Sequence, residues 1–397
     1  MRPRLLIVAS TFPARSGDGT PGFVRDLAIE EAIDFDVMVV VPRVPGGAER
    51  EEDNGLTVVR YPYWFAGSES LAHGAIIENL RARPANWLQV LPFLFAQYRA
   101  VRRAVRDFRP DVMHVHWIIP QGVVARFAAR GVPKLVTTLG GDLYALNAAP
   151  IRALKSGVVT RADAVTVMND DMRARVIALG APENAVSVLP MGADLVRVSA
   201  AAAAAGPRKV GTDVRILFVG RLVEKKGLAV LLDALGELET SEWNLTVVGD
   251  GPLRSQLEDA AAALPVTFVG QLGRDELIAQ YLLADICVFP SVPAASGDQD
   301  GLPVALLEAM GAGAAIVASN VPGINEVIRD GSNGLLTPAG DSAALRSAIE
   351  RLASQRDLRA TLAAGARATA QTYSSTVIGE RYRAILQGLR NPARATR

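Results

Sequence analysis

Residues 285–313 read DICVFPSVPAASGDQDGLPVALLEAMGAG, and this stretch decides how the rest of the chain is interpreted. The apolar run at 285–290 predicts a buried strand, and the apolar run after Pro303 predicts a helix, because proline suits the first helical turn. The loop between them delivers the chain to a helix N-terminus, whose free N–H groups favour an anion. Asp300 stands just before that terminus and Glu308 lies inside the helix, where carboxylates can accept hydrogen bonds from sugar hydroxyls. The stretch therefore predicts a nucleotide-sugar site.

The composition fits a globular chain of two domains. With 397 residues, half of them hydrophobic, the chain exceeds what one core ordinarily supports. A net charge of +1 argues against a dedicated nucleic-acid-binding protein. The single cysteine, Cys287, excludes a disulfide within the chain and fits a reducing, cytoplasmic compartment. Residues 1–10 predict a first β-strand rather than a signal peptide, and no apolar run is long enough to predict a membrane-spanning helix.

Strands and helices alternate in both halves of the chain, which predicts an α/β protein with parallel sheets. Between the halves, residues 196–212 contain six consecutive alanines followed by Gly-Pro-Arg-Lys, a change in composition that indicates a linker. We therefore expect a first domain over 1–195, a second over 213–372 and a terminal helix over 373–397.

A glycine loop, GDGTPG at residues 17–22, follows the first predicted strand. A dinucleotide-binding loop directly follows its strand, and an acidic residue stands at the end of the second strand. This chain has neither feature. We favour a loop whose backbone approaches a phosphate or a sugar, and a turn with no ligand role is the alternative.

The segment from Trp87 to Arg109 is predicted to be a helix with one apolar and one basic face. The basic face holds Arg99, Arg102, Arg103 and Arg106. One interpretation is the solvated side of a domain helix. The other is a face that meets anionic lipid together with the apolar residues near Trp87, which would make the protein peripheral at the inner membrane face.

Three residues of the first half are candidates for the acceptor side of a site. His116, Gly141 and Asp142 follow predicted strands, and ligands gather at the carboxyl ends of strands in open α/β sheets. A packed, hydrogen-bonded core histidine is the alternative for His116. Two histidines at i and i+2 without a third ligand do not make a zinc site, so we expect no metal.

Arg221 and Lys226 flank a loop between a predicted strand and helix, where both can reach the loop at 300–303. Arginine offers phosphate a bidentate fork and lysine a compact charge, so together they can neutralise a diphosphate leaving group. We interpret the neighbouring Lys225 as surface charge.

The second half of the chain resembles the retaining glycosyltransferases of family 4. Their GT-B fold has two facing Rossmann-like domains and a C-terminal helix that crosses back to the first domain. The matching segments are 218–221, 226–227, 248–253, 300–310, 317–328 and 331–336. The first half matches more loosely, through residues 23–24, 111–117, 142 and 192–194.

The resemblance implies that Arg221 and Lys226 hold the donor diphosphate, that Glu308 accepts from the ribose hydroxyls, and that Asp300 lies near the donor sugar. It makes Arg221, Lys226 and Asp300 the catalytic group. The donor-binding residues that it implies are Gly19, Arg221, Lys226, Gly270, Asp300, Gly301, Leu302, Pro303 and Glu308. Three positions depart from the family pattern: Asp300 replaces a glutamate, Leu139 stands where a histidine is common, and Met191 stands where an asparagine is common.

The resemblance implies transfer of a sugar, with retention of configuration, from a UDP- or GDP-sugar to a saccharide or lipid-linked acceptor. The expected setting is polysaccharide or glycolipid synthesis, with no cofactor beyond the nucleotide sugar. The alternatives are a non-catalytic nucleotide- or carbohydrate-binding protein, and another GT-B enzyme such as a nucleotide-sugar epimerase.

Overall fold

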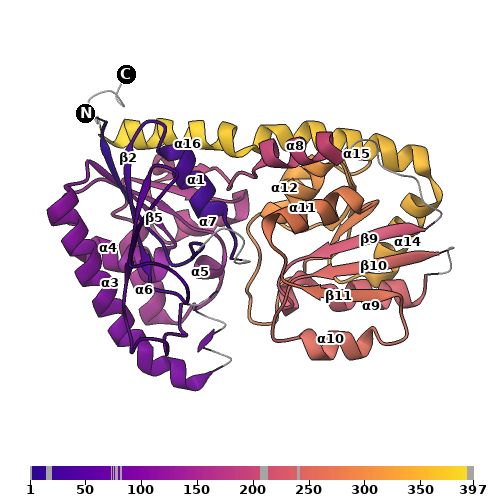
Figure 1. The fold of residues 1–397 in the computed structure, drawn as a ribbon, viewed down its shortest axis with the longest axis horizontal. Coiled ribbons are helices and arrows are strands. Elements are labelled where there is room, and N and C mark those ends of the chain that lie inside the picture. The colour runs from indigo at the N-terminus through magenta and orange to yellow at the C-terminus, as the bar shows by residue number, and fades with distance from the viewer. Residues whose placement is uncertain are drawn as a thin grey trace. The chain divides into compact units, whose positions relative to one another are not determined.

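The chain forms two compact units in the computed structural model (Figure 1). The first unit combines the chain up to Pro190 with the chain from Ile378 onward, and the second runs from 191 to 377. The structure describes residues 2–14, 20–72, 74, 76, 79–80, 83–205, 213–238 and 242–390.

The segment expected to be a linker begins as a helix. Helix α8 spans Leu195–Ala205, and its buried Leu195 and Val198 lie in the second unit, where α8 packs against helix α12 (Val304–Ala312). Consecutive alanines favour helix because they lose no side-chain entropy in it. Residues 206–212 lie outside the described residues.

In the described part of the first unit, the core is an eight-stranded sheet in the order β3-β4-β2-β1-β5-β6-β7-β8. Neighbouring strands are parallel except β3 and β4. The central strands β1 and β5 are buried along nearly their whole length, as in parallel sheets covered on both faces. The strands are β1 (Arg4–Val8), β2 (Asp36–Pro42), β3 (Arg50–Asp53), β4 (Leu56–Tyr61), β5 (Val112–His116), β6 (Lys134–Thr137), β7 (Ala164–Val167) and β8 (Val186–Val188).

The second unit, over the residues that the structure describes, contains a six-stranded sheet in the order β11-β10-β9-β12-β13-β14. All its strand pairs are parallel, so the loops that follow the strands meet at one edge. The strands are β9 (Val214–Val219), β10 (Trp243–Val248), β11 (Val266–Gly270), β12 (Ile286–Phe289), β13 (Ala315–Ser319) and β14 (Leu335–Thr337).

Helices connect most of the described strands of both units, and none of the described helices is long and apolar enough to cross a membrane. The further helices are α1 (Phe23–Glu31), α3 (Trp87–Phe108), α4 (Val123–Ala128), α5 (Gly141–Tyr144), α6 (Ala149–Val159), α7 (Asp170–Ala178), α9 (Leu228–Gly236), α10 (Arg254–Ala260), α11 (Arg274–Leu283), α13 (Ile324–Val327), α14 (Ser342–Ser354), α15 (Arg356–Ala370) and α16 (Ser375–Arg390).

The last helix, α16, packs onto the first unit through Tyr382. Its buried hydroxyl donates to the carbonyl of Leu189 at 2.9 Å, and its ring stacks on His114 with 5.4 Å between centroids. His114 in turn contacts Glu31 and Thr137, each at 2.7 Å. Burial lowers the pKa of His114 to about 3, so its imidazole is neutral. The predicted return of the terminal helix to the first unit is confirmed.

Two glycines allow the loops after β9, β10 and β12 to approach one another. Gly227 has φ +66°, and a Cβ there would lie 1.8 Å from the carbonyl oxygen of Pro290. Gly249 has φ +132°, and a Cβ there would lie 1.9 Å from the carbonyl oxygen of Gly220. Only glycine avoids both the strained φ and the collision with backbone, so these positions fix the loop edge of the second sheet.

We expect Gly227→Ala to lower the free energy of unfolding by about 2–4 kcal/mol, because the new methyl group meets a backbone carbonyl that cannot rotate away. Urea denaturation gives this value. Gly236→Ala, on α9 with nothing within 4 Å of the added Cβ, is the matched control and should change stability by less than about 1 kcal/mol. Equal effects of the two substitutions would contradict this account of the loop.

Candidate active site

The loop from Gly220 to Gly227 carries three cations at the carboxyl edge of the second sheet. Arg221 is half-buried there. Burial lowers its pKa, and the negative charge of Asp298 opposes that shift. An arginine keeps its charge under such a perturbation, so Arg221 presents a cation in a partly dry setting.

Two consecutive lysines pair with the loop that leads to α12. Lys226 Nζ lies 2.7 Å from Asp300 Oδ2. Lys225 Nζ lies 3.1 Å from Asp298 Oδ2 and 3.5 Å from Asp300 Oδ1. All four side chains are between 14% and 19% exposed. We call Arg221, Lys225, Lys226, Asp298 and Asp300 the ion cluster; its three cations and two carboxylates leave one net positive charge.

The pKa shifts of Asp300 and Lys225 indicate that these two groups stay ionised. Burial acts to raise the pKa of Asp300, but Lys226 and Lys225 outweigh it and lower the pKa. Burial likewise acts to lower the pKa of Lys225, but Asp300 and Asp298 outweigh it and raise the pKa. Each charge is therefore held by its opposite neighbours rather than by water.

The prediction that Lys225 is surface charge is wrong. The 3-10 turn at Glu224–Lys226 directs two consecutive lysines to the same acidic loop. The turn also holds that loop by its backbone, because Val292 N donates to Lys225 O at 2.9 Å and Ala295 N donates to Glu224 Oε1 at 2.9 Å.

Helix α12 begins where the sequence predicts. Pro303 is its N-cap residue, with φ −67° and ψ 121°, and the helix starts at Val304. Gly301, Leu302 and Pro303 are buried against the unit, so the backbone N–H groups of the first turn are held at a fixed place beside Asp300. A helix N-terminus next to the ion cluster favours an anion.

Glu308 lies one turn further along α12 and is positioned by a tyrosine. Tyr281 of α11 is fully buried, and its hydroxyl donates to Glu308 Oε2 at 3.1 Å. Burial and then the charge of Glu308 raise the pKa of Tyr281, so the phenol keeps its proton and orients the carboxylate.

Gly270 ends β11 at the same edge of the sheet. It has φ +74°, and its carbonyl accepts from Gly249 N at 2.8 Å. The structure thus brings Gly270 to the loop edge that carries the ion cluster, together with Arg221, Lys226, Asp300 and Glu308.

The first-unit candidates lie at the carboxyl edge of its own sheet. Asp142 is buried and accepts from Ile118 N at 2.6 Å and from Thr138 Oγ1 at 2.8 Å, so it joins two loops. Gly141 is the first residue of α5. His116 is fully buried, with its ring centroid 4.1 Å from that of His114.

His116 differs from a hydrogen-bonded core histidine. No group among the described residues forms a hydrogen bond with either of its ring nitrogens. Burial, and then His114, lower its pKa well below the usual value, so the ring is neutral. An acceptor-side role for these three residues stays a prediction. Gly19, expected on the donor side, lies outside the described residues.

Sequence reasoning misses Asp298 and Tyr281. The spacing of Asp298 and Asp300, opposite two consecutive lysines, is the signal that could have revealed the larger ion cluster. No comparable signal reveals Tyr281, because its hydrogen bond joins residues 27 positions apart.

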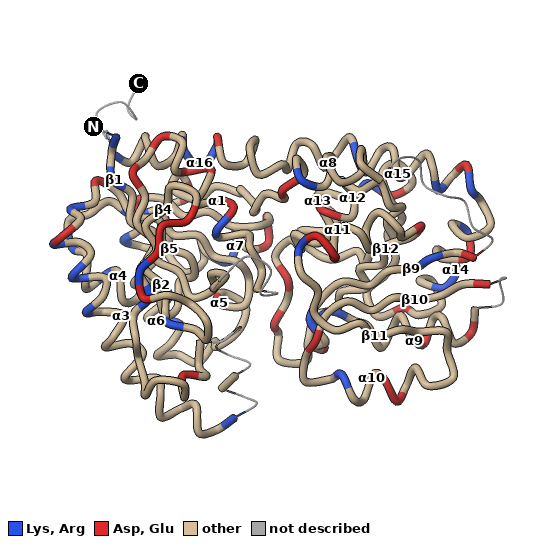
Figure 2. Tube along the Cα trace, viewed as in Figure 1, with Lys and Arg blue, Asp and Glu red and all other residues tan. Residues whose placement is uncertain are grey.

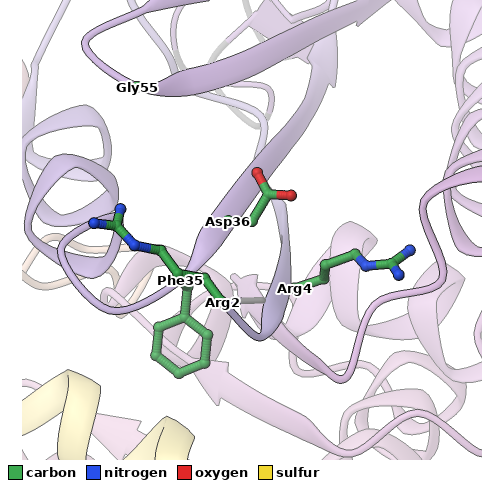
Figure 3. Close-up of a pocket in the computed structure, with 5 residues that line it drawn as sticks. All are labelled: Arg2, Arg4, Phe35, Asp36 and Gly55. Carbon is green, nitrogen blue, oxygen red and sulfur yellow. The ribbon is translucent and has the colours of Figure 1, made fainter.

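A surface pocket lined by Arg2, Arg4, Phe35, Asp36 and Gly55 lies away from these residues (Figure 3). Arg4 and Asp36 begin β1 and β2, so this pocket is at the amino end of the first sheet. Ligands of open α/β sheets gather at the opposite end, and we assign no part of the active site to it.

Both halves of the chain match known families. Residues 213–355 match the family described as glycosyl transferases group 1, and residues 24–192 match the glycosyl transferase 4-like domain. Among solved structures, sucrose-phosphate synthase from Thermosynechococcus elongatus is similar over 98% of this chain and 99% of that one, with a TM-score of 0.79. Its sequence identity is 19%, so this likeness concerns the fold.

Two relatives match different shares of this chain. The amylovoran biosynthesis glycosyltransferase AmsK of Erwinia amylovora is 36% identical over 184 residues, which are 45% of this chain and 44% of AmsK. The chain thus spans about half the length of this relative. The phosphatidyl-myo-inositol mannosyltransferase of Mycobacterium leprae is 32% identical over 305 residues, which are 72% of this chain and 76% of that protein.

Proposed function

The chain belongs to the glycosyl transferases of group 1 and has the GT-B fold, and from this premise we propose that it moves a sugar from a nucleotide-sugar donor to a saccharide or lipid-linked acceptor. The observation that carries the proposal is the ion cluster beside the N-terminus of α12, with Glu308 one turn further along the helix. These groups match the parts of a nucleotide sugar: a diphosphate, a ribose and a sugar.

The diphosphate is the part that needs the cations. As the donor's glycosidic bond breaks, negative charge grows on the departing diphosphate, and fixed positive groups stabilise it. Arg221 and Lys226 supply that charge in a partly dry loop. Lys226 must then leave its 2.7 Å contact with Asp300, and Lys225 remains to hold that carboxylate. Because the charge comes from side chains, we propose that the reaction needs no metal.

The other two parts of the donor have one carboxylate each. Glu308, oriented by Tyr281, accepts from the ribose hydroxyls. Asp300, at the start of α12, turns to the donor sugar once Lys226 engages the diphosphate. The backbone from Gly301 to Pro303 lies along the proposed donor site between Asp300 and Glu308.

We propose that transfer retains the anomeric configuration. The bond between the sugar's anomeric carbon and the diphosphate oxygen breaks, and the acceptor oxygen bonds to that carbon on the same face. The acceptor's proton passes to the departing diphosphate oxygen, so no protein nucleophile is required. Arg221 and Lys226 hold that leaving group while it accepts the proton.

The names of two relatives support a saccharide or lipid-linked acceptor. One acts in amylovoran biosynthesis and another is named for transfer of mannose to phosphatidyl-myo-inositol. We propose accordingly a glycan or lipid-linked acceptor, in polysaccharide or glycolipid synthesis, approached from the side of His116, Gly141 and Asp142.

Apolar side chains on the outer face of α3 support a membrane-surface location for that acceptor. Leu88, Leu91 and Phe95 are 62–77% exposed and recur at helical spacing. Arg99, Arg102 and Arg106 are exposed and continue the same helical spacing. Figure 2 shows that basic positions recur along α3. We propose that the apolar end inserts among lipid chains while the arginines meet anionic headgroups.

We expect Arg221→Ala to weaken nucleoside diphosphate binding at least about tenfold, because a charge-assisted hydrogen bond contributes about 1.5–3 kcal/mol. Asp300→Asn should bind the diphosphate as tightly or more tightly, since it removes the partner of Lys226, and should transfer sugar more slowly. Calorimetry with UDP, GDP and ADP measures the first effect, and release of nucleoside diphosphate from the matching sugar donors, in the presence of EDTA, measures the second.

Arg351→Ala, an exposed arginine of α14, is the control and should change neither quantity. Unchanged affinity of Arg221→Ala for every nucleotide would contradict the donor assignment. Binding without release of nucleoside diphosphate would instead favour a non-catalytic binding protein, and a product of inverted configuration would contradict retention.

We expect Leu88→Ser combined with Leu91→Ser to reduce binding to anionic vesicles at least about tenfold, because each exposed leucine loses roughly 1.5–3 kcal/mol of apolar burial. Co-sedimentation with phosphatidylcholine vesicles, with and without phosphatidylglycerol, measures the effect. Ile33→Ser removes a 54% exposed apolar residue outside α3 and should leave binding unchanged. Wild-type binding that ignores the anionic lipid would rule out the proposal.

A further inference from the structure

A second group of cations lines a pocket in the first unit, and we propose that this pocket binds a phosphate group. Its basic residues are Arg126, Arg130, Lys134 and Arg161, and its apolar lining includes Val136 and Val158. Lys134 begins β6, so the pocket is at the amino edge of the sheet, opposite the edge that holds His116 and Asp142. It is a separate site from the one proposed for sugar transfer.

Two of the guanidinium groups converge on helix α6 at Gly157. A Cβ at Gly157 would lie 2.3 Å from Arg126 Nη1, so the arginine lies directly against the helix only because this residue is glycine. Arg161 Nη1 lies 3.4 Å from the carbonyl oxygen of the same glycine. Two like charges held at one residue repel each other unless an anion lies between them.

No carboxylate of the described chain forms an ion pair with any of the four cations. The nearest acid along the chain is Asp163, and its Oδ2 accepts from the backbone N–H of Lys134 at 2.8 Å. Lys134 Nζ donates to Val132 O at 2.6 Å. Burial lowers the pKa of Lys134, and Asp163 opposes this only in part. Asp163 therefore offsets only part of the positive charge of the pocket.

Three buried or half-buried arginines of the same unit are paired with acids. Arg25 lies 2.5 Å from Asp53, Arg43 lies 2.7 Å from Glu69, and Arg60 lies 2.5 Å from Glu51. The four cations of the pocket, of which Arg130 and Arg161 are exposed, have no such acid partner among the described residues. Arginine forks and a lysine around a concave space are the donors that phosphate selects.

The apolar lining favours a phosphate that carries an apolar or weakly polar substituent. Two sources supply that chemistry: a phospholipid headgroup, or a free phosphate ester. Helix α4, which carries Arg126, packs against α3, so a headgroup could reach the pocket from the surface on which α3 lies.

The test uses the full chain carrying Arg221→Ala, which weakens phosphate binding at the ion cluster. One arm titrates inorganic phosphate by calorimetry. The other compares vesicles of phosphatidylcholine containing phosphatidic acid with vesicles containing phosphatidylglycerol at equal charge. The variants are Arg126→Gln with Arg161→Gln, and Gly157→Ala, which keeps every charge and displaces only the end of Arg126. Arg152→Gln, an exposed arginine of α6 outside the pocket, is the control.

We expect the double variant to weaken phosphate or phosphatidic acid binding at least about tenfold, Gly157→Ala to weaken it in the same direction, and Arg152→Gln to leave it unchanged. A loss confined to the vesicles identifies a lipid headgroup, and a loss confined to inorganic phosphate identifies a soluble ester. The proposal is overturned if the parent shows neither saturable phosphate binding nor a preference for phosphatidic acid. It is also overturned if Arg152→Gln weakens binding as much as the double variant does, or if both pocket variants bind as tightly as the parent. Thermal unfolding of each variant confirms that it is folded.

Discussion

The contact between Lys226 and Asp300 is the interaction on which the proposed donor site depends. Four charged side chains, each less than a fifth exposed, hold one another in place because water cannot do so. The pairing keeps two lysines oriented without a ligand, yet Arg221 leaves the ion cluster with one net positive charge. In the proposed reaction, an arriving diphosphate takes Lys226 from Asp300, and the side chains that receive it are already ordered. Such pre-organisation is what electrostatic stabilisation of a leaving group requires.

The backbone of the second unit brings the loops that carry Lys226 and Asp300 together. Parallel strands bring the loops after β9, β10 and β12 to one edge, and Gly227 and Gly249 let those loops touch through backbone atoms. Helix α12 then presents its N-terminus beside Asp300 and, one turn on, Glu308. The same logic of strand ends applies in the first unit, where Asp142 joins two loops beside His116.

Much of this organisation could be predicted from the sequence, because it rests on local patterns. Apolar runs and turn residues indicate the strand–helix alternation, and Pro303 marks the start of α12. Arg221, Lys226 and Asp300 could be grouped because each follows a strand in one sheet. Lys225 and Tyr281 could not be assigned correctly, since their partners lie far along the chain and depend on side-chain direction. The helix at the start of the expected linker could not be predicted for a related reason: six alanines indicate a change in composition, while buried Leu195 and Val198 anchor them as helix α8.

The most direct test of the account is a crystal structure of the protein with the nucleoside diphosphate that binds most tightly. We predict that Lys226 Nζ and the guanidinium of Arg221 contact diphosphate oxygens, that Glu308 accepts from the ribose hydroxyls while Tyr281 still donates to it, and that Lys225 alone retains Asp300. A diphosphate bound elsewhere, with the contact between Lys226 and Asp300 intact at its present 2.7 Å, would contradict the central claim.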